Sequence, residues 1–537
     1  MDVLGPGIHN HEDVLHKIFG LESYRPFQRE VIETLLSGKD CLAVLPTGGG
    51  KSLCYQIPGL CRPGLTLVIS PLISLMADQL SWLEKLGIPS ATLNSTINQK
   101  EYKSTLSDLR KGVIRLLYAA PETLASPWLR DFLSELPLQF IAVDEAHCIS
   151  QWGHDFRPEY REIRSLRTKF PSVPCLALTA TATPGVQRDI MRTLGMEKGL
   201  RYVADFDRPN IHFSVLPRST ASQGGWKNQV YTLCRKHKDQ SGIIYCMTRK
   251  RTEELAVFLQ SKKLQAMVYH AGLADKLRKK NQKLFLEKQG TIVVATIAFG
   301  MGINKPDVRF VIHADLPKTL ENYYQEVGRA GRDGEPAAGY LLYSYSDVFR
   351  LKQIMDLTDS QGMKELYKVV DWADGQTCRR AALLNHFGQK TGDLNCTGCD
   401  VCVTDEDQKE PVKKKNGVSR TQEKQSRNKT VNRTIEAQKF LSCVYRTGQR
   451  FGTSMVVNVL LGSRSQVVRE KGFTSLTTYG IGIDRSRQWW TNLSQALEFE
   501  GYVERDEHFS GLRLTDKARI ALKNRQEISL PSFVEPE

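Results

Sequence analysis

Short apolar runs alternate with amphipathic stretches along about the first 345 residues of the chain. Up to about residue 205 they predict five buried strands, at Cys41–Leu45, Leu65–Ser70, Ile114–Ala119, Phe140–Asp144 and Cys175–Thr179. The rhythm restarts near residue 206 with four more, at Ser241–Cys246, Ala266–His270, Thr291–Ala295 and Arg309–His313. Strands that alternate with helices predict parallel sheets covered by helices on both faces. We therefore expect two α/β domains in tandem, with a cleft between them where one ligand could contact both.

After about residue 345 the pattern becomes helical, and it is followed by a polar stretch at residues 411–433. This stretch holds eight Lys or Arg, one Glu and almost no apolar residue, so it predicts a mobile linker. From about 434 to 525 helices return and end in two strand-like runs, at Gly501–Glu504 and Leu512–Leu514, the pattern of a winged helix. The predicted divisions are 1–205, 206–345, 346–410, the linker 411–433, the winged helix 434–525 and a tail, 526–537.

Composition limits the class of protein. The chain of 537 residues is long enough for about three or four domains, and its 41% hydrophobic and 25% charged residues are typical of soluble globular proteins. No apolar run approaches the roughly 20 residues of a membrane span. Residues 1–10 lack the charged and apolar segments of a secretory signal, so we expect an intracellular protein with no membrane partner.

The net charge is +15 at pH 7, and the isoelectric point is near 9.2. A strongly basic balance favours a polyanionic partner, most simply nucleic acid. The alternative is a merely basic protein whose charge serves no partner.

A glycine-rich segment follows the first predicted strand and contains Thr47, Gly48, Gly49, Gly50, Lys51 and Ser52. A glycine-rich turn between a strand and a helix exposes N–H groups that can wrap the phosphates of ATP. Lys51 can then reach the outer phosphates, and the Ser52 hydroxyl can bind Mg²⁺. The segment departs from the usual pattern, because Leu45 stands where that pattern has its first glycine. The alternative is an ordinary glycine-rich turn with a surface lysine.

Two adjacent acids, Asp144 and Glu145, end the predicted strand that begins at Phe140. Ligands of open α/β sheets bind at the carboxyl ends of strands. There Asp144 could hold Mg²⁺ while Glu145 orients or deprotonates the attacking water. The alternative is the acidic start of a helix, where Asp serves as an N-cap.

A second catalytic candidate lies in the segment Tyr323–Gly334, which contains Gln325, Arg329 and Arg332. The two arginines are three residues apart and share one face of a helix or turn. A guanidinium delivered across the cleft can stabilise charge on the transferring γ-phosphate and make hydrolysis depend on domain closure. The alternative is a solvated basic face.

The loop Ser150–Tyr160 follows the acidic pair and carries Trp152, His154, Phe156 and Arg157. Aromatic and basic side chains in a loop with Gly and Pro form a candidate surface for stacking DNA bases. The alternative is a small aromatic core beneath the loop.

Four cysteines, Cys378, Cys396, Cys399 and Cys402, have the spacing C-x17-C-x2-C-x2-C. Four thiolates predict a tetrahedral, structural Zn²⁺ site. A redox pair or accidental clustering is the alternative, and His386 is either a spare ligand or a packing residue. The other eight cysteines mostly lie in apolar runs and are expected to be small buried hydrophobes.

Together these segments resemble the RecQ family of DNA helicases, within helicase superfamily two, from about residue 14 to 525. Phe19–Gln28 resembles the family's adenine-reading motif, which implies that Gln28 hydrogen-bonds adenine and that Arg25 packs on it. The Trp152–Tyr160 segment resembles the family's aromatic-rich loop. Ile243–Arg249 and Ala298–Asp307 resemble motifs that grip the strand and the nucleotide. Arg332 matches the family's arginine finger, with Arg329 as its companion.

The resemblance implies two RecA-like parallel-sheet domains, a helical zinc-binding module and a winged helix. It implies an ATP-dependent 3′-to-5′ DNA helicase of repair, recombination and replication that uses ATP, Mg²⁺ and Zn²⁺. Its partners would be single-stranded and duplex DNA and, by family resemblance, single-strand-binding protein and topoisomerase. The location would be the cytoplasmic nucleoid of a bacterium or a eukaryotic nucleus.

At the winged helix, His508 and Phe509 would contact duplex DNA, although an ordinary turn explains them equally well. Many bacterial members continue into a further small helical domain, for which the sequence ending at Glu537 leaves no room. Two other classes stay open: an RNA-remodelling ATPase on the same motor, and a nucleic-acid scaffold with a decayed motor.

Overall fold

The computed structural model describes residues 10–46, 48–94, 96–150, 157–219, 225–300, 305–344, 346–354, 360–375, 377–391, 396–403, 431–505 and 511–530. The chain separates into two compact units, Met1–Glu410 and Pro411–Glu537, which are described one at a time. The predicted linker and tail therefore fall largely outside the described residues, as do Thr47, Trp152, His154, Phe156, His508 and Phe509.

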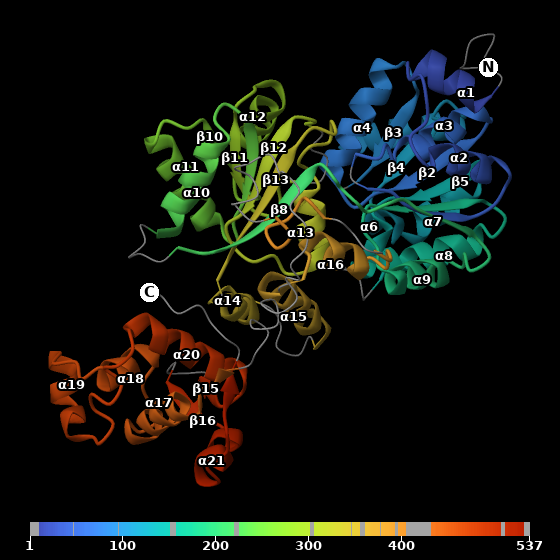
Figure 1. Ribbon diagram of the computed structural model, residues 1–537. Coiled ribbons are helices and arrows are strands. Elements are labelled where there is room, and N and C mark those ends of the chain that lie inside the picture. The colour runs from blue at the N-terminus through green and yellow to red at the C-terminus, as the bar shows by residue number, and fades with distance from the viewer. Residues whose placement is uncertain are drawn as a thin grey trace, which may run out of the picture. The chain divides into compact units, whose positions relative to one another are not determined.

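The first unit begins with a parallel seven-stranded sheet in the order β3-β4-β2-β5-β6-β1-β7 (Figure 1). Its strands are β1 (Cys41–Val44), β2 (Leu65–Ile69), β3 (Ser90–Leu93), β4 (Leu116–Ala119), β5 (Leu138–Val143), β6 (Cys175–Thr179) and β7 (Leu200–Val203). Side chains of β1 alternate between two hydrophobic clusters, with Leu42 and Val44 in one and Cys41 and Ala43 in the other. Burial on both faces explains why the central strands are continuously apolar.

Helices cover this sheet and complete the first lobe, which we define as the first sheet with its helices. They are α1 (His11–Asp13), η1 (Val14–Ile18), α2 (Gln28–Leu36), α3 (Leu53–Cys61), α4 (Ile73–Lys85), α5 (Gln99–Arg110), α6 (Pro121–Leu124), α7 (Pro127–Ser134), η2 (Ala146–Ile149), η3 (Pro158–Arg161), α8 (Glu162–Lys169) and α9 (Pro184–Thr193). Local sequence sets their starts: Asn98 and Glu101 form a capping box at α5, and Thr183 caps α9.

A second parallel sheet has six strands in the order β10-β11-β9-β12-β13-β8. They are β8 (Ile211–Pro217), β9 (Ser241–Tyr245), β10 (Ala266–Tyr269), β11 (Ile292–Ala295), β12 (Val308–His313) and β13 (Ala337–Tyr343). With α10 (Gly225–Lys236), α11 (Arg249–Ser261), α12 (Asp275–Glu287) and α13 (Leu320–Val327) it forms the second lobe. This sheet, too, has a hydrophobic cluster on each face.

Four strands of the two lobes were not predicted from the sequence. Two of them, β3 and β7, lie at sheet edges and are partly or largely exposed, so neither shows a continuous apolar run. The other two, β8 and β13, carry polar or small residues: a His and a Ser in β8, and two Ala and a Gly in β13. Tertiary pairing, rather than local apolarity, makes these segments strands.

Three further helices follow the second lobe: α14 (Ser346–Ile354), α15 (Ser360–Asp374) and α16 (Arg379–His386). The α16 segment packs against both lobes, since Leu383 joins a second-lobe cluster while Leu384 and Phe387 join one of the first lobe. The Phe387 ring stacks on Phe206 with ring centroids 4.6 Å apart. The helix beside the cysteine cluster is therefore packed against the first and the second lobe.

The second unit is mainly helical, with a core around Trp489 and Trp490. Its elements are α17 (Thr434–Arg446), α18 (Thr453–Leu460), α19 (Gln466–Glu470), η6 (Phe473–Ser475), α20 (Arg487–Phe499), α21 (Asp516–Lys523), β14 (Val431–Asn432), β15 (Val503–Arg505), β16 (Leu512–Leu514) and β17 (Ser529–Leu530). The antiparallel pair β15–β16 is the expected hairpin. The pair β14–β17 differs from expectation, because it places residues assigned to the linker and the tail in one sheet of this unit.

Candidate ATP site and cysteine cluster

The glycine-rich segment links β1 to α3, as its sequence context predicts. Gly48 and Gly50 adopt φ values of +84° and +72°, which side chains other than glycine rarely tolerate. A Cβ on Gly50 would lie 2.3 Å from Gln28 Nε2, and one on Gly49 would lie 2.9 Å from the Pro46 carbonyl oxygen. The loop therefore needs glycine for both conformation and space.

Arg25 and Gln28 hold this loop from outside. Gln28 Nε2 donates to the carbonyl oxygens of Gly49 and Gly50 at 3.2 and 2.9 Å, and Arg25 Nη1 donates to that of Gly48. Gln28 is 1% exposed, and its Oε1 accepts from Arg25 N at 2.8 Å. The resemblance implied contacts to adenine for these side chains; their contacts to the loop backbone gave no signal in the sequence.

Lys51 and the acidic pair meet at the carboxyl edge of the first sheet. Lys51 Nζ donates to the Leu45 carbonyl oxygen at 3.4 Å. Burial, followed by the neighbouring Glu145 charge, raises the pKa of Asp144 to about 7, while Lys51 acts in the opposite direction. Asp144 Oδ1 accepts from Glu145 N at 3.0 Å. Two carboxyl groups under 10% exposed are thus held side by side.

The same pair fits a divalent cation. Glu145 Oε2 is buried and has no hydrogen-bond partner among the described residues, and Glu145 sits at a φ of +46°, in the left-handed region. Mg²⁺ prefers oxygen ligands that carry negative charge. The acidic pair therefore suits a magnesium ion.

His147 is a site residue that the sequence analysis did not single out. Its Nδ1 lies 2.8 Å from Thr179 Oγ1, at the end of β6, and 3.4 Å from Glu145 Oε2. Burial and then the Lys51 charge lower the pKa of His147 to about 3, so the ring is neutral at pH 7. The one sequence feature that could have identified His147 as a site residue is its position close to an acidic pair at the end of a strand.

Arg332 of the second lobe reaches the phosphate loop of the first. A Cβ on Gly48 would lie 3.5 Å from Arg332 Cδ. Burial and the nearby Arg329 and Arg208 charges lower the pKa of Arg332 to about 9, which leaves it positive at pH 7. Arg329 is buried and donates to the Gly300 carbonyl oxygen instead, while Gln325 is half-buried on α13.

The four cysteines of the predicted zinc site come together. Their sulfur atoms lie within 4.8 Å of one another, and Cys378 also caps α16. Burial raises the pKa of Cys399, but N–H donors of Arg379, Cys402 and Val401 outweigh it, so its pKa lies below the ordinary value. Four converging thiol groups suit a closed, tetrahedral Zn²⁺ site.

His386 lies apart from the thiol groups. Its Nε2 contacts Glu321 Oε1 at 2.7 Å, and Glu365 completes a second polar cluster. Lys368 Nζ donates to Glu365 at 2.8 Å, so this cluster already contains a cation.

Of the predicted DNA-stacking loop, Arg157 is described. Its N donates to the Cys148 carbonyl oxygen at 3.0 Å and its Nη1 to that of Pro71 at 3.3 Å. Tyr160, which ends the loop, is buried and donates to the Asp144 carbonyl oxygen at 3.0 Å. The loop is therefore anchored at its far end to the strand that carries the acidic pair.

None of the described helices is long and apolar enough to cross a membrane.

Four protein families match consecutive parts of the chain. They are the DEAD/DEAH box helicase (residues 25–189), the helicase conserved C-terminal domain (227–334), RecQ zinc-binding (345–403) and the RQC domain (427–537).

Relatives match almost the whole chain. The ATP-dependent DNA helicase RecQ of Pasteurella multocida (strain Pm70) is 42% identical, over 96% of this chain and 79% of that protein. The protein of the same name from Bacillus subtilis (strain 168) is 38% identical, over 97% of this chain and 85% of that one.

Among solved structures, the DUF1998 helicase MrfA bound to DNA and AMPPNP is similar in fold. Its TM-score is 0.54 at 20% identity, over 77% of this chain and 61% of that one.

Proposed function

Because the chain belongs to the RecQ family of DNA helicases, we propose that it splits ATP between its two lobes to move 3′-to-5′ along DNA. Membership of this family makes it an ATP-dependent DNA helicase with a zinc-binding domain, and we assign the zinc ligands to its four clustered cysteines. The direction of movement, the work in repair and recombination, and the role of each residue are our proposals.

The observation that supports a shared ATP site is the approach of Arg332 to Gly48 across the two lobes. We assign ATP phosphate binding to residues 47–52, with Lys51 on the outer phosphates. Arg332 stabilises the charge that develops on the γ-phosphate. Arg329, fixed on Gly300, holds the segment that carries Arg332, and Gln325 is assigned to the same nucleotide.

Ser52 and Asp144 would hold magnesium, which supplies positive charge to the phosphates. Glu145 orients the water that attacks the γ-phosphate and accepts its proton. His147, neutral and bonded to Thr179, links this acidic pair to the end of β6. A change in the position of β6 would therefore move His147 and, through it, the carboxylate of Glu145.

Gln28 and Arg25 are assigned to adenine. Because both also hold the carbonyl groups of the phosphate loop, adenine binding and the shape of the loop are coupled. The coupling explains how a base far from the reacting phosphate favours hydrolysis of the right nucleotide.

The nucleic-acid surface is assigned to Trp152, His154, Phe156 and Arg157 in the first lobe and to Thr248 and Arg249 in the second. Thr248 and Arg249 are exposed at the start of α11, where N–H groups and a guanidinium favour a phosphate. His508 and Phe509 are assigned to duplex DNA at the fork.

Single-strand-binding protein and topoisomerase are the proposed protein partners, and the nucleoid or the nucleus is the proposed location.

Forked duplexes with a single 3′ or a single 5′ tail test the proposal, with and without ATP. We expect the 3′-tailed duplex to open, and only with ATP. Opening of the 5′-tailed duplex alone would reverse the proposed direction. ATP hydrolysis stimulated by RNA but not by DNA would favour the RNA-remodelling alternative.

A further inference from the structure

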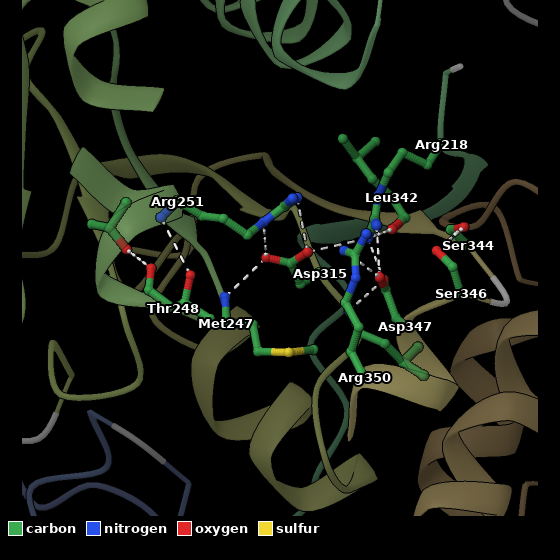
Figure 2. A network of polar contacts seen from close by, with 12 residues as sticks. Arg218, Met247, Thr248, Arg251, Asp315, Leu342, Ser344, Ser346, Asp347 and Arg350 are labelled. Carbon is green, nitrogen blue, oxygen red and sulfur yellow. Dashed lines mark hydrogen bonds and ion pairs between the residues drawn. The ribbon is translucent and has the colours of Figure 1, made fainter. Parts of the chain in front are cut away.

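A buried network of charged residues lies at the carboxyl ends of strands in the second sheet. Asp315 follows β12, Arg218 follows β8, Asp347 lies on α14 and Arg251 on α11. Figure 2 shows Asp315 between Arg251 and Arg218, with Asp347 on the other side of Arg218 and the Met247 backbone N–H bonded to Asp315.

Asp315 connects the network to the turn between β9 and α11. Its Oδ2 accepts from Met247 N at 2.9 Å and from Arg251 Nε at 3.0 Å, and its side chain is 3% exposed. The Arg251 guanidinium also lies 4.0 Å from the centre of the Trp226 ring. One carboxylate thus fixes both the backbone that enters the turn and a side chain of the helix that leaves it.

Asp347 connects the same network to α14, the first helix after the second lobe. It is fully buried and is bonded to both terminal nitrogens of Arg218. Its Oδ2 also accepts from Leu316 N at 3.1 Å, one residue after Asp315. Burial raises the pKa of Asp347, and Arg218 acts in the opposite direction. Arg218 Nη2 lies 3.5 Å from Asp315 Oδ1, so a single guanidinium joins the two carboxylates.

The turn held by Asp315 presents three exposed residues, Thr248, Arg249 and Lys250. Thr248 Oγ1 accepts from Arg251 N at 3.3 Å and so caps α11. Arg249 extends toward the segment after β10, since a Cβ on Gly272 would lie 2.9 Å from Arg249 Nη1. The backbone of the turn is therefore held by hydrogen bonds, while the side chains on its outer face are exposed.

Buried ion networks add little stability compared with apolar packing, because each charge must lose its hydration. What they do provide is a fixed geometry, and the geometry fixed here is that of an exposed basic turn. We propose that Asp315 is a positioning residue for DNA binding, which aims Thr248 and Arg249 at a phosphate of the bound strand. The inference rests on the proposed function of this turn. Because Asp347 joins α14 to the same network, the position of the turn also depends on α14.

The Asp315→Asn variant tests the proposal, because it keeps the size of the side chain and removes its charge. We expect the DNA concentration for half-maximal stimulation of ATP hydrolysis to rise about tenfold, with the maximal rate and the DNA-free rate within about twofold of wild type. The salt dependence of DNA binding should become shallower by about one unit, because one phosphate contact is lost. Asp275→Asn is the matched control: it makes the same chemical change at an exposed acid of the second lobe, which begins α12 and is paired with Arg278.

A second measurement separates positioning from loss of structure. In the wild-type chain Arg249→Ala should weaken DNA binding, whereas in the Asp315→Asn chain it should cost almost nothing more. Additive losses, or a fall in the maximal rate with a lowered thermal midpoint, would overturn the proposal in favour of a structural role. If DNA stimulates the wild type and Asp315→Asn binds DNA with unchanged affinity, the positioning role of Asp315 is overturned and the proposed function stands. A wild type that DNA does not stimulate would overturn the proposed function itself.

Discussion

Asp144 shows most clearly what burial does to a single acidic group. Its pKa is raised to about 7 from an ordinary value of 3.8, mainly by burial and then by Glu145. The unfolded chain therefore loses this proton at a lower pH than the folded chain. The folded state consequently loses stability as the pH rises from about 4 to about 7, and the full cost is present above that range.

The Asp144→Asn variant should remove this cost. Without nucleotide or magnesium, we expect its midpoint of thermal unfolding to exceed that of wild type by roughly 2–6 °C at pH 8.5, and by much less at pH 5.5. Asp131→Asn, which changes an exposed acid of the first lobe, is the control and should show no such difference. A gain of equal size at both pH values would mean that Asp144 is not a charge burden in the free protein.

Gly50 is a residue whose identity follows from geometry alone. We expect Gly50→Ala to raise the KM for ATP about tenfold or more, because the added Cβ would strain the loop at a φ of +72° and displace Gln28. Gly112→Ala is the control for strain without displacement: its φ is +68°, with nothing within 4 Å of the added atom. Equal KM values in both variants would show that Gln28 does not support the loop.

Among the elements, most of the central strands were predictable because burial on both faces leaves a continuous apolar run; β13, which begins with two Ala and a Gly, was the exception. The edge strands β3 and β7 were not predictable, because they are partly or largely exposed. At the site, the sequence identified the glycine-rich loop, the acidic pair and the cysteines, each a local pattern. It could not show that Arg332 approaches Gly48 or that His386 pairs with Glu321, because these contacts join segments far apart in the chain.

The α16 helix begins at one cysteine of the cluster and packs against both lobes. Loss of the metal should therefore destabilise more of the chain than the cluster alone. We expect Cys399→Ser to reduce bound zinc from about one per chain to near zero and to lower the thermal midpoint, since metal binding is coupled to folding. Cys61→Ser, outside the cluster, should keep its zinc. Full metal content in Cys399→Ser, measured by atomic absorption, would contradict a site with four thiolate ligands.

In the site that we propose for the first unit, the two lobes contribute different parts of one reaction centre. The first lobe supplies the phosphate loop and the acidic pair, and the second supplies Arg332. A site divided in this way couples hydrolysis to the closing of the lobes, and DNA bound across both would favour closure. This division of the site between two lobes is the central claim.

The most direct test is the steady-state rate of ATP hydrolysis with and without single-stranded DNA, in wild type and in the Lys51→Ala and Arg332→Ala variants. The account predicts that DNA raises the wild-type rate at least about tenfold and that each substitution removes nearly all hydrolysis, although the variants still bind DNA. Stimulation that survives in Arg332→Ala, or a wild-type rate that DNA leaves unchanged, would contradict a site shared between the lobes.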